Sequence, residues 1–395
     1  MEYFDRFDKL KTYLEKESFK GWDPYDGLNS KVFQTLPLKH WDIARWVWIQ
    51  FFKRSPVNLR KLLLVPKEYN NKGLGLLLTA YCNLYEINEK LGEKAPYTQQ
   101  SIKDIISLMA DHLLCSKSDN PESASWGYNF DWQARRLFLF PRNTPNVVTT
   151  YFVFYGLIQA YEVTQKEEYL TTALSSANFV LNQLKRTPSG SGFLFSYSSL
   201  DGNNTVYNAS LLAAKILSHC YYYTQNNRYK DAAKETINAC VEAQNPDGSW
   251  YYGVLSVQRW IDSFHTGYNL DALVAYQDFC DDNTFAQAFD KGFTYYLETF
   301  FHSDGKPKYY HNQTYPIDIH CPAQLFVTLH RSHRFQQHQE LAKRVMHWTL
   351  DNMQDKKGYF YYQKKPIFSS KISYMRWSNA FMFYAMSYFM KETLK

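Results

Sequence analysis

Apolar positions along the chain form two kinds of helical pattern. In the first kind, apolar residues recur every three or four positions and charges occupy the opposite side, as in a helix with one exposed face. Such stretches are predicted to be outer helices at 101–114, 167–184, 228–244, 284–301 and 338–353. In the second kind the stretch is apolar nearly all round, which is typical of a helix covered on most sides. These are predicted to be inner helices at 73–88, 144–164, 205–224, 262–279, 319–332 and 375–390.

A short segment of turn-forming and aromatic residues separates each outer helix from the next inner one. These segments occupy 116–130, 187–198, 245–253, 302–310 and 354–362. Their spacing of roughly 50 to 65 residues fits a repeated helical hairpin. With the N-terminal helices completing the ring, the pattern predicts an all-α fold, an (α/α)6 toroid with a central funnel and short β-hairpins or turns at one end. No linker rich in Pro, Gly or Ser interrupts the series, so we expect a single domain over 1–395.

Composition adds an excess of aromatic residues to this picture. Aromatics make up 18% of the chain, with 33 Tyr, 28 Phe and 10 Trp. Phe residues pack in a hydrophobic core. So many Tyr residues indicate rings that pack on a helix and place a hydroxyl in a water-filled cavity. Stacking platforms for sugar rings are one use, and plain helix packing is the other.

Charge and cysteine content exclude several classes of protein. Lys and Arg number 44 against 38 Asp and Glu, and we expect this surplus of +6 to be spread along the chain without a long basic block, which does not favour nucleic acid as a partner. No apolar run reaches the length of about 18 residues needed to span a membrane. The charged N-terminus lacks the apolar core of a signal peptide, so we expect a cytoplasmic protein. The six cysteines lie far apart without a CxxC pair, as reduced core residues do.

Candidate ligand-binding residues cluster where the chain enters each inner helix. Helix N-termini should converge at that mouth of the funnel with unpaired NH groups and partial positive charge. The entry loops carry Asn, His, Asp, Arg and aromatic residues, which suit a polar ligand site. Helix capping is the alternative for each Asn. The predicted substrate-binding residues are Asp131, Arg135, Asn146, Tyr207, Asn208, Trp260, His320, Arg376 and Trp377.

The segment RWIDSFHTGYNL at 259–270 carries the most specific chemistry. Asp262 begins the helix, and His265 and Tyr268 follow at intervals of three, so all three can share one face. Asp262 is a candidate proton donor to a glycosidic oxygen if its apolar neighbours, Trp260 among them, raise its pKa. Alternatively His265 takes a proton from a sugar carbon next to a carboxylate, and Tyr268 returns one to the leaving oxygen. An Asp cap with a hydrogen-bonded His is the structural alternative.

Two further loops supply candidate charges. YPIDIHCP at 315–322 holds Asp318, a candidate carboxylate partner for Asp262, beside His320 and Cys321. With no second motif of metal-ligand spacing, we expect neither a metal nor another cofactor. In FDWQARR at 130–136, Asp131 is followed by Arg135 and Arg136. An Arg there, or Arg376, is suited to hold a ligand carboxylate in a fork, unless it forms a salt bridge within the rim.

Several family resemblances support these predictions. EAQNPDGSWYYG at 242–253 resembles the Q-x-x-D-G-S-W repeat of terpene cyclases and protein prenyltransferases, which implies a toroid turn rather than an activity. WIDSFHTG resembles a segment of unsaturated glucuronyl and rhamnogalacturonyl hydrolases in the six-hairpin glycosidase superfamily, which implies that Asp262 is a general acid. The mixture of Asn, His, Tyr and Arg is similar to toroid polysaccharide lyases and uronyl C5-epimerases. The whole chain resembles uncharacterised bacterial proteins associated with surface-polysaccharide clusters.

The sequence therefore predicts a carbohydrate-active enzyme that binds a uronic-acid-containing oligosaccharide or polysaccharide in the funnel. Hydrolysis through the catalytic residues Asp262 and Asp318 is the first hypothesis. Elimination or C5-epimerisation through His265 and Tyr268 is the second, and a toroid that binds a glycan or a partner without catalysis is the third.

Overall fold

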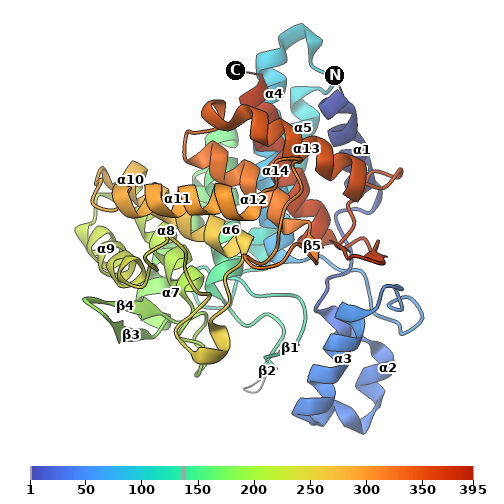
Figure 1. Cartoon of the computed structure of the whole chain (residues 1–395), viewed down its shortest axis with the longest axis horizontal. Helices are drawn as coiled ribbons and strands as arrows, with labels where there is room; N and C mark the ends of the chain where they lie inside the picture. Colours follow the sequence, from blue (N-terminus) through green and yellow to red (C-terminus); the bar gives the residue numbers. More distant parts are fainter. Residues whose placement is uncertain (1, 135–138, 395) are drawn as a thin grey trace.

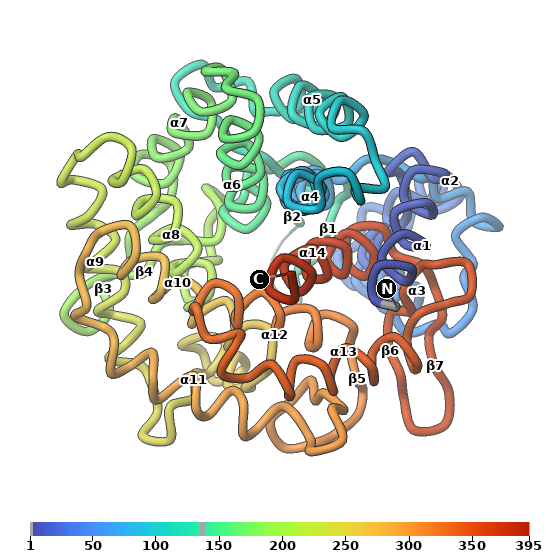
Figure 2. The backbone as a smooth tube through the Cα atoms, turned by 90° about the horizontal axis from the view of Figure 1, so that it is seen from above, coloured from blue at the N-terminus to red at the C-terminus, as the bar shows by residue number. Residues whose placement is uncertain are grey.

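The computed structural model describes residues 2–134 and 139–394, which form two concentric rings of helices. Figure 2 looks onto these rings. Each inner helix packs on the next, and the last packs on the first, so the inner ring is closed. The inner helices in the described chain are α4 (Asn71–Leu91), α6 (Val147–Thr164), α8 (Tyr207–Thr224), α10 (Ser263–Cys280), α12 (His320–Arg331) and α14 (Phe381–Thr393). This is the predicted (α/α)6 toroid.

The outer ring covers the inner helices one by one. Its helices are α1 (Glu2–Lys16), α5 (Gln99–Cys115), α7 (Glu167–Gln183), α9 (Asn227–Glu242), α11 (Ala286–Phe300) and α13 (Gln339–Met353). The first of them, α1, packs on the last inner helix, α14, and the two chain ends lie at the same end of the molecule (Figure 1). Within the described ranges, no helix has both the length and the apolar character that crossing a membrane requires.

The inner helices are buried along most of their length, and their ends follow a common pattern. Asn70, Asn146 and Asp262 cap α4, α6 and α10 with a side-chain oxygen that accepts a backbone NH, as expected for these residue types. Three inner helices end at a residue in the left-handed region, at φ 59°, 56° and 47°: Gln165, Gln225 and Asp281. The inner segment predicted from Met375 begins with a π-helical turn, Met375–Ala380, before α14.

Short antiparallel strands lie in the connections that enter the inner helices. The pairs are β1 (Trp132–Gln133) with β2 (Leu139–Phe140) and β3 (Arg186–Ser189) with β4 (Gly192–Phe195). A three-stranded sheet joins β5 (Ile317–Asp318), β6 (Gln363–Lys364) and β7 (Ser369–Ser370). In Figure 1 these connections lie on the lower side of the rings. All of them belong to one end of the toroid, which we call the mouth.

The Q-x-x-D-G-S-W segment forms a turn that ties neighbouring outer helices together. Gln244 Nε2 donates to the carbonyls of Gly248 and of Ala288 in α11, both at 3.0 Å. Gly248 has φ 95°, which favours glycine. Gln354 makes the equivalent pair of hydrogen bonds, since its side-chain amide donates to the carbonyls of Gly358 and of a residue of α1. The segment thus forms a turn of the toroid, as predicted.

An extension absent from the helical-hairpin pattern precedes α4. It contains α2 (Lys31–Thr35) and α3 (Asp42–Arg54), and we call residues 31–64 the α2–α3 lobe. The lobe stands below the rings beside β1 and β2 (Figure 1), with α3 in contact with β1. It therefore borders the mouth.

Two glycines set the distance between the inner helices α4 and α6. A Cβ built on Gly75 would lie 2.5 Å from the Phe152 carbonyl oxygen, and one on Gly156 would lie 2.8 Å from the Gly75 carbonyl oxygen. Real Cβ atoms do not approach backbone this closely. The two backbones can therefore meet only because both positions lack a side chain.

Gly75→Ala should destabilise the fold, because the added methyl forces α4 away from α6. We expect a loss of about 1–3 kcal/mol in the free energy of unfolding, measured by urea denaturation. Gly73→Ala is the matched control in the same helix, since its Cβ would meet nothing closer than 3.4 Å. There, better helix propensity should leave stability unchanged or raise it by up to about 1 kcal/mol. Equal effects of the two substitutions would contradict this account.

Candidate functional site

Isolated β-bridges link each entry loop of the mouth to the next. Asn146 pairs with Ser198, Val206 with Gly253, and Asp262 with Tyr310, all antiparallel. Each pair joins the residue at the start of one inner helix to the loop that enters the next. The helix starts are thereby held side by side, and their polar residues are brought together across large sequence distances.

Both carboxylate oxygens of Asp262 are hydrogen-bonded at the mouth. Its Oδ1 accepts the His265 backbone NH at 3.0 Å, which caps α10. Its Oδ2 lies 2.7 Å from His265 Nδ1 and accepts Trp260 Nε1–H at 3.0 Å. The side chain is completely buried. Both oxygens therefore serve protein donors, and the carboxylate fixes the orientation of the His265 ring.

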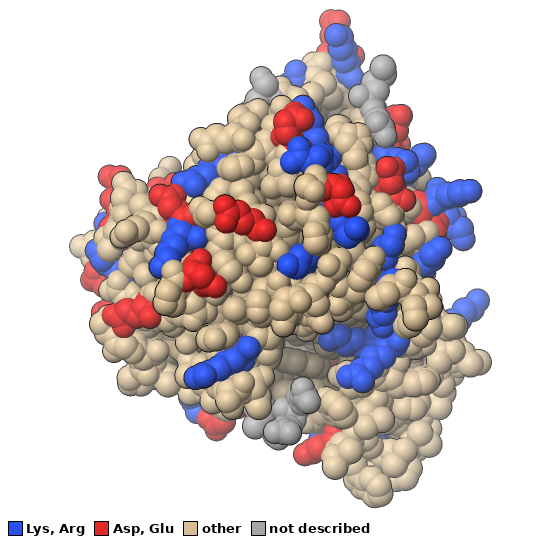
Figure 3. Space-filling view, viewed as in Figure 1, with Lys and Arg blue, Asp and Glu red and all other residues tan. Residues whose placement is uncertain are grey.

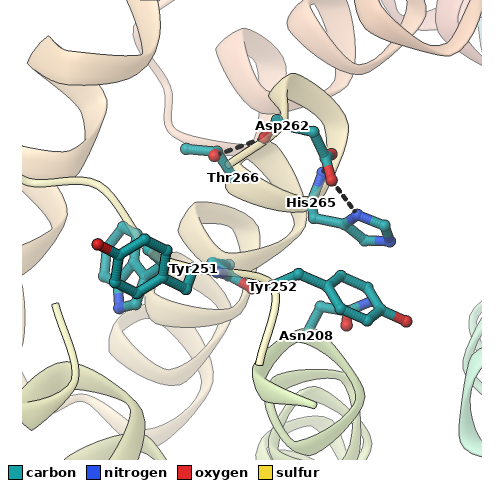
Figure 4. A pocket seen from close by; sticks show the side chains of 8 residues that line it. Asn208, Tyr251, Tyr252, Asp262, His265 and Thr266 are labelled. Atoms are coloured by element: carbon teal, nitrogen blue, oxygen red, sulfur yellow. Dashed lines mark hydrogen bonds and ion pairs between the residues drawn. The ribbon is translucent and has the colours of Figure 1, made fainter. Parts of the chain in front are cut away.

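His265 presents its other ring nitrogen to a narrow crevice (Figure 4). The side chain is 19% exposed, and within the described residues its Nε2 makes no hydrogen bond. The ring meets Tyr252 edge-on, with centroids 4.7 Å apart, and Tyr252 stacks on Trp260 at 4.4 Å. Aromatic groups thus hold the imidazole on one side, and the Asp262 carboxylate holds it on the other.

The crevice is closed in this structure, with no room for a water molecule. Its lining combines aromatic rings with polar groups from α8 and α10: Asn208, Trp250, Tyr251, Tyr252, Asp262, His265, Thr266 and Asn269. Within the described chain, the side-chain oxygens of Asn208 and Asn269 are buried without a hydrogen-bond partner. Buried polar atoms rarely stay unpaired. Both oxygens are therefore available to a ligand hydroxyl.

Asp318 does not line this crevice but lies in a second polar cluster of the mouth. Its Oδ1 accepts Trp377 Nε1–H at 2.8 Å and the His320 backbone NH at 3.0 Å, and its Oδ2 accepts Gln363 Nε2–H at 2.8 Å. Burial raises the pKa of the carboxyl to about 6, against the opposing effect of these donors. Phe264 lies between the two clusters, in ring contact with both His265 and Trp377.

His320 stacks in the aromatic wall behind Asp318. Its ring lies 4.0 Å from Phe381 and 4.4 Å from Trp377. Burial, reinforced by Lys72, holds the pKa of His320 well below its usual range. Among the described residues, its Nδ1 has no hydrogen-bond partner. It is a neutral imidazole with one free nitrogen.

Tyr268 points into the toroid axis beneath the mouth. Its hydroxyl lies 3.5 Å from Lys72 Nζ, and the ammonium also lies 4.5 Å from the Phe152 ring and 5.9 Å from Phe381. These groups come from four different inner helices, so they meet at the axis and fill it. Burial lowers the pKa of Lys72 and raises that of Tyr268. At this level the predicted funnel is closed, and ligand space is confined to the mouth.

The guanidinium of Arg376 is bound to a carboxylate of the protein and is not free to hold a ligand. Its Nε and Nη2 donate to the two carboxylate oxygens of Asp23, at 2.5 and 2.7 Å. The guanidinium also lies 5.0 Å from the centre of the Tyr128 ring. Close by, Arg60 Nε donates to Asp26 at 2.7 Å. The Asp23–Arg376 ion pair ties the chain before the lobe to the π-helical turn that precedes α14, as in the salt-bridge alternative for Arg376.

The remaining predicted residues lie apart from the crevice. Asn146 accepts the Thr149 backbone NH at 2.9 Å and thus acts as a helix cap. Asp131 accepts the Arg142 backbone NH at 2.7 Å. Tyr207 is buried at the start of α8. Arg135 and its alternative Arg136 lie outside the described residues.

Several residues at the mouth escaped sequence analysis. Asp23, Arg60 and Lys72 precede the first complete hairpin and belong to no repeated segment. Tyr252 could have been predicted from the sequence, because it lies in the aromatic segment 245–253 just before the Asp262 loop. In the described parts of the chain, no three His, Cys, Asp or Glu side chains are placed to hold a metal ion.

Comparisons with known proteins show the fold. No protein-family model and no curated protein matches the sequence. The chain is similar in structure to a GH76 alpha-mannanase of Bacteroides thetaiotaomicron, with a TM-score of 0.60, 14% identity and coverage of 81% of this chain and 85% of that chain. A sugar epimerase from a ruminal bacterium has a TM-score of 0.60 and 12% identity, with coverage of 83% of this chain and 90% of that chain. An unsaturated glucuronyl hydrolase specific for heparin has a TM-score of 0.55 and 13% identity, with coverage of 82% of this chain and 86% of that chain.

The raised pKa of Asp318 should make stability fall as pH rises from about 4 to 6. In this interval the unfolded carboxyl loses its proton while the folded one keeps it, so the folded state binds more protons and loses stability with rising pH. The expected loss is about 3 kcal/mol. Asp318→Asn stays neutral in both states and should show a fall smaller by this amount when unfolding free energies are measured across the interval, because the buried carboxyl of Asp26, whose pKa is also raised to about 6, still contributes its own fall. Parallel pH profiles of the two proteins would contradict the assignment.

Proposed function

We propose that this chain is a carbohydrate-active enzyme that binds a terminal sugar at the mouth and moves a proton at a sugar carbon, with His265 as the base. The observation that carries the proposal is the 2.7 Å contact between His265 Nδ1 and Asp262 Oδ2. A carboxylate in this position fixes the tautomer and stabilises the imidazolium that forms when Nε2 accepts a proton. Nε2 is the nitrogen left free toward the crevice.

This assignment reverses the order of the two hypotheses from sequence. As a general acid, Asp262 would need a proton and an oxygen free for the substrate. Its oxygens instead accept three N–H groups, from the His265 backbone, the His265 ring and Trp260. Asp262 therefore suits a positioning role better than proton donation.

The reaction begins at the carbon next to the sugar carbonyl. His265 Nε2 takes the C–H proton, and the electron pair moves to the carbonyl oxygen to give an enediolate. Return of the proton to the neighbouring carbon, with the hydroxyl proton of the original carbon passing to the former carbonyl oxygen, yields the isomer. Protonation of the original carbon on its other face yields the epimer. Tyr268, whose pKa is raised by burial and whose ring lies 6.0 Å from that of His265, is the candidate for the second face, and this role requires its hydroxyl to leave Lys72 and open to the mouth. With a uronic acid, the same deprotonation beside the carboxylate leads to C5-epimerisation or elimination.

Binding of a sugar follows from the lining of the crevice. The Trp260–Tyr252 stack offers aromatic surface to the apolar face of a ring, and the unpaired oxygens of Asn208 and Asn269 accept hydroxyl groups. The filled axis leaves room for one end of a saccharide rather than for a threaded chain. Because the crevice is narrow, ring entry requires a shift of the loop that carries Trp260.

The structural comparisons support a carbohydrate substrate without selecting the reaction. A mannanase, a sugar epimerase and a glucuronyl hydrolase all share this fold with the chain. The choice among the reactions comes from the bonding of Asp262 and His265.

Hydrolysis remains the second candidate because of Asp318. A buried carboxyl with a pKa of about 6 keeps its proton at mildly acidic pH and suits a general acid for a glycosidic oxygen. This role requires the Trp377 and Gln363 contacts to open to substrate. A mouth that binds a glycan without catalysis is the remaining alternative.

Proton transfer can be tested by hydrogen exchange. The protein is incubated in D2O with reducing disaccharides, uronic acid oligosaccharides and their unsaturated forms, and NMR follows deuterium entry at carbon. We expect exchange with isomer or epimer formation, a loss of about 10²–10⁴-fold in His265→Ala, and a similar loss in Asp262→Asn because the tautomer is no longer fixed. Gln183→Glu, far from the crevice on α7, is a control that should keep full exchange.

Product masses separate the hydrolytic alternative. Gain of water without exchange at carbon, lost in Asp318→Asn but retained in His265→Ala, would replace the present proposal with hydrolysis. A rise in absorbance of the unsaturated uronyl group that depends on His265 would identify elimination instead. Saccharide binding without any turnover across the panel would leave only the non-catalytic alternative.

A further inference from the structure

Exposed apolar side chains gather at the mouth end of the molecule. Sixteen large hydrophobic residues of the described chain are exposed, and thirteen of them lie in connections that enter inner helices. Eight belong to the α2–α3 lobe, three to the loop 254–257 and two to the tip 367–368. A soluble monomer normally scatters such residues singly. Their concentration at one end indicates a surface that meets an apolar partner.

Helix α3 carries the core of this surface. Ile43, Val47 and Phe51 follow one another at intervals of four, so they form one stripe, and their exposed fractions are 79%, 51% and 45%. The opposite side of α3 is buried, with Ile49 and Phe52 in the interior. A shallow groove runs along the exposed side and reaches Arg54. The stripe is therefore available along three turns of the helix.

The same lobe carries the net charge of the chain. Residues 31–64 hold seven of the 44 Lys and Arg but one of the 38 Asp and Glu, so the remaining residues carry 37 of each sign. The surplus of positive charge is therefore concentrated in the lobe. The expectation that it is spread along the chain is wrong. Arg60 pairs with Asp26, and Arg45 pairs with Asp42. Within the described residues, the exposed cations Lys31, Arg54 and Lys61 have no acidic partner.

The two loop tips repeat this combination of apolar and basic residues. Val254, Leu255 and Val257 precede the exposed Arg259, and Ile367 is 96% exposed between Lys365 and Lys371. Both tips adjoin the site, since 254–257 leads into Trp260 and 367–368 follows Gln363. On the face seen in Figure 3, the lobe at the lower right is largely uncharged, and the surface is hollowed between it and the toroid.

We propose that the α2–α3 lobe, with the tips 254–257 and 367–368, docks the protein on an anionic lipid membrane. Exposed Trp, Phe and Ile beside Lys and Arg are the combination that inserts at a lipid interface, where the rings enter the boundary and the cations meet anionic headgroups. A second copy of this chain fits less well, because it would bring the same unpaired cations together. Nucleic acid would leave the apolar stripe in water.

Docking in this way holds the mouth at the membrane surface. The lobe joins the mouth through Tyr25, which accepts a hydrogen bond from Lys53 and meets the Trp377 ring at 5.8 Å. A saccharide carried on a lipid would then be presented to the crevice. This consequence for the substrate rests on the proposed function, whereas the docking itself does not.

Vesicle flotation of the full chain tests the docking. The probes are vesicles of phosphatidylcholine alone and of an equal mixture with phosphatidylglycerol. We expect binding to the mixed vesicles that weakens with added salt, and binding about tenfold weaker or more to the neutral ones. The substitutions Ile43→Ser, Val47→Ser and Phe51→Ser together should lower binding about tenfold or more. Lys31→Gln, Arg54→Gln and Lys61→Gln together should abolish the preference for the anionic lipid.

Controls separate this surface from other exposed apolar residues and from the crevice. Leu108→Ser with Tyr222→Ser removes two exposed side chains outside the mouth and should leave vesicle binding unchanged. Asp262→Asn should also bind vesicles normally, so failure of the sugar chemistry and failure of docking remain distinguishable. Absence of binding by the unaltered chain, or equal loss in the control, would overturn the proposal. A dimer in light scattering that the α3 substitutions dissociate, without vesicle binding, would assign the surface to a second copy.

Discussion

Closure of the inner ring is the constraint on which the rest of this structure depends. Each inner helix must pack on two neighbours and on an outer helix, so nearly its whole circumference is apolar. Where α4 meets α6 the backbones approach so closely that only Gly75 and Gly156 fit. Because every inner helix runs from the same end, closure also brings all the helix starts, and the loops before them, to one mouth. The chemistry of the protein is concentrated there for this geometric reason.

The closed ring also restricts what polar groups inside it can do. Lys72 and Tyr268 meet at the axis among Phe rings, and deeper in the barrel Asp271 is bonded to Gln324 and Thr328 with Lys215 and Arg331 nearby. Buried polar groups are costly unless partnered. These clusters fill the interior, and most of their polar atoms contact one another, whereas Gln324 Oε1 and Arg331 Nε have no hydrogen-bond partner within the described residues. The free capacity for a ligand lies above them, in the unpaired oxygens of Asn208 and Asn269 and in the open nitrogen of His265.

The mouth is assembled by two kinds of contact of different range. Local contacts along one segment produce the Asp262–His265 pair, because a cap and a residue three positions later share a helix turn. Long-range contacts produce the rest: Asp318 with Trp377 and Gln363, and Asp23 with Arg376. The local pair forms wherever α10 forms, whereas the long-range clusters exist only once α14 has closed against α4. The lobe adds a third element, since its buried Arg60 and Asp26 link it to this closure and leave its apolar face outward.

The sequence by itself determined the helices, their division into inner and outer sets, and hence the toroid, because helical periodicity and the covered or exposed character of a face are local properties. It also identified Asp262 and His265 together, since their spacing fixes their contact. Only the tertiary structure gave Asp262 three hydrogen-bond donors and left His265 one free ring nitrogen, and the proposed roles rest on these contacts. It likewise paired Arg376 with Asp23 and filled the axis with Lys72 and Tyr268. Residues hundreds of positions apart meet only through ring closure, and no local pattern encodes which of them will meet.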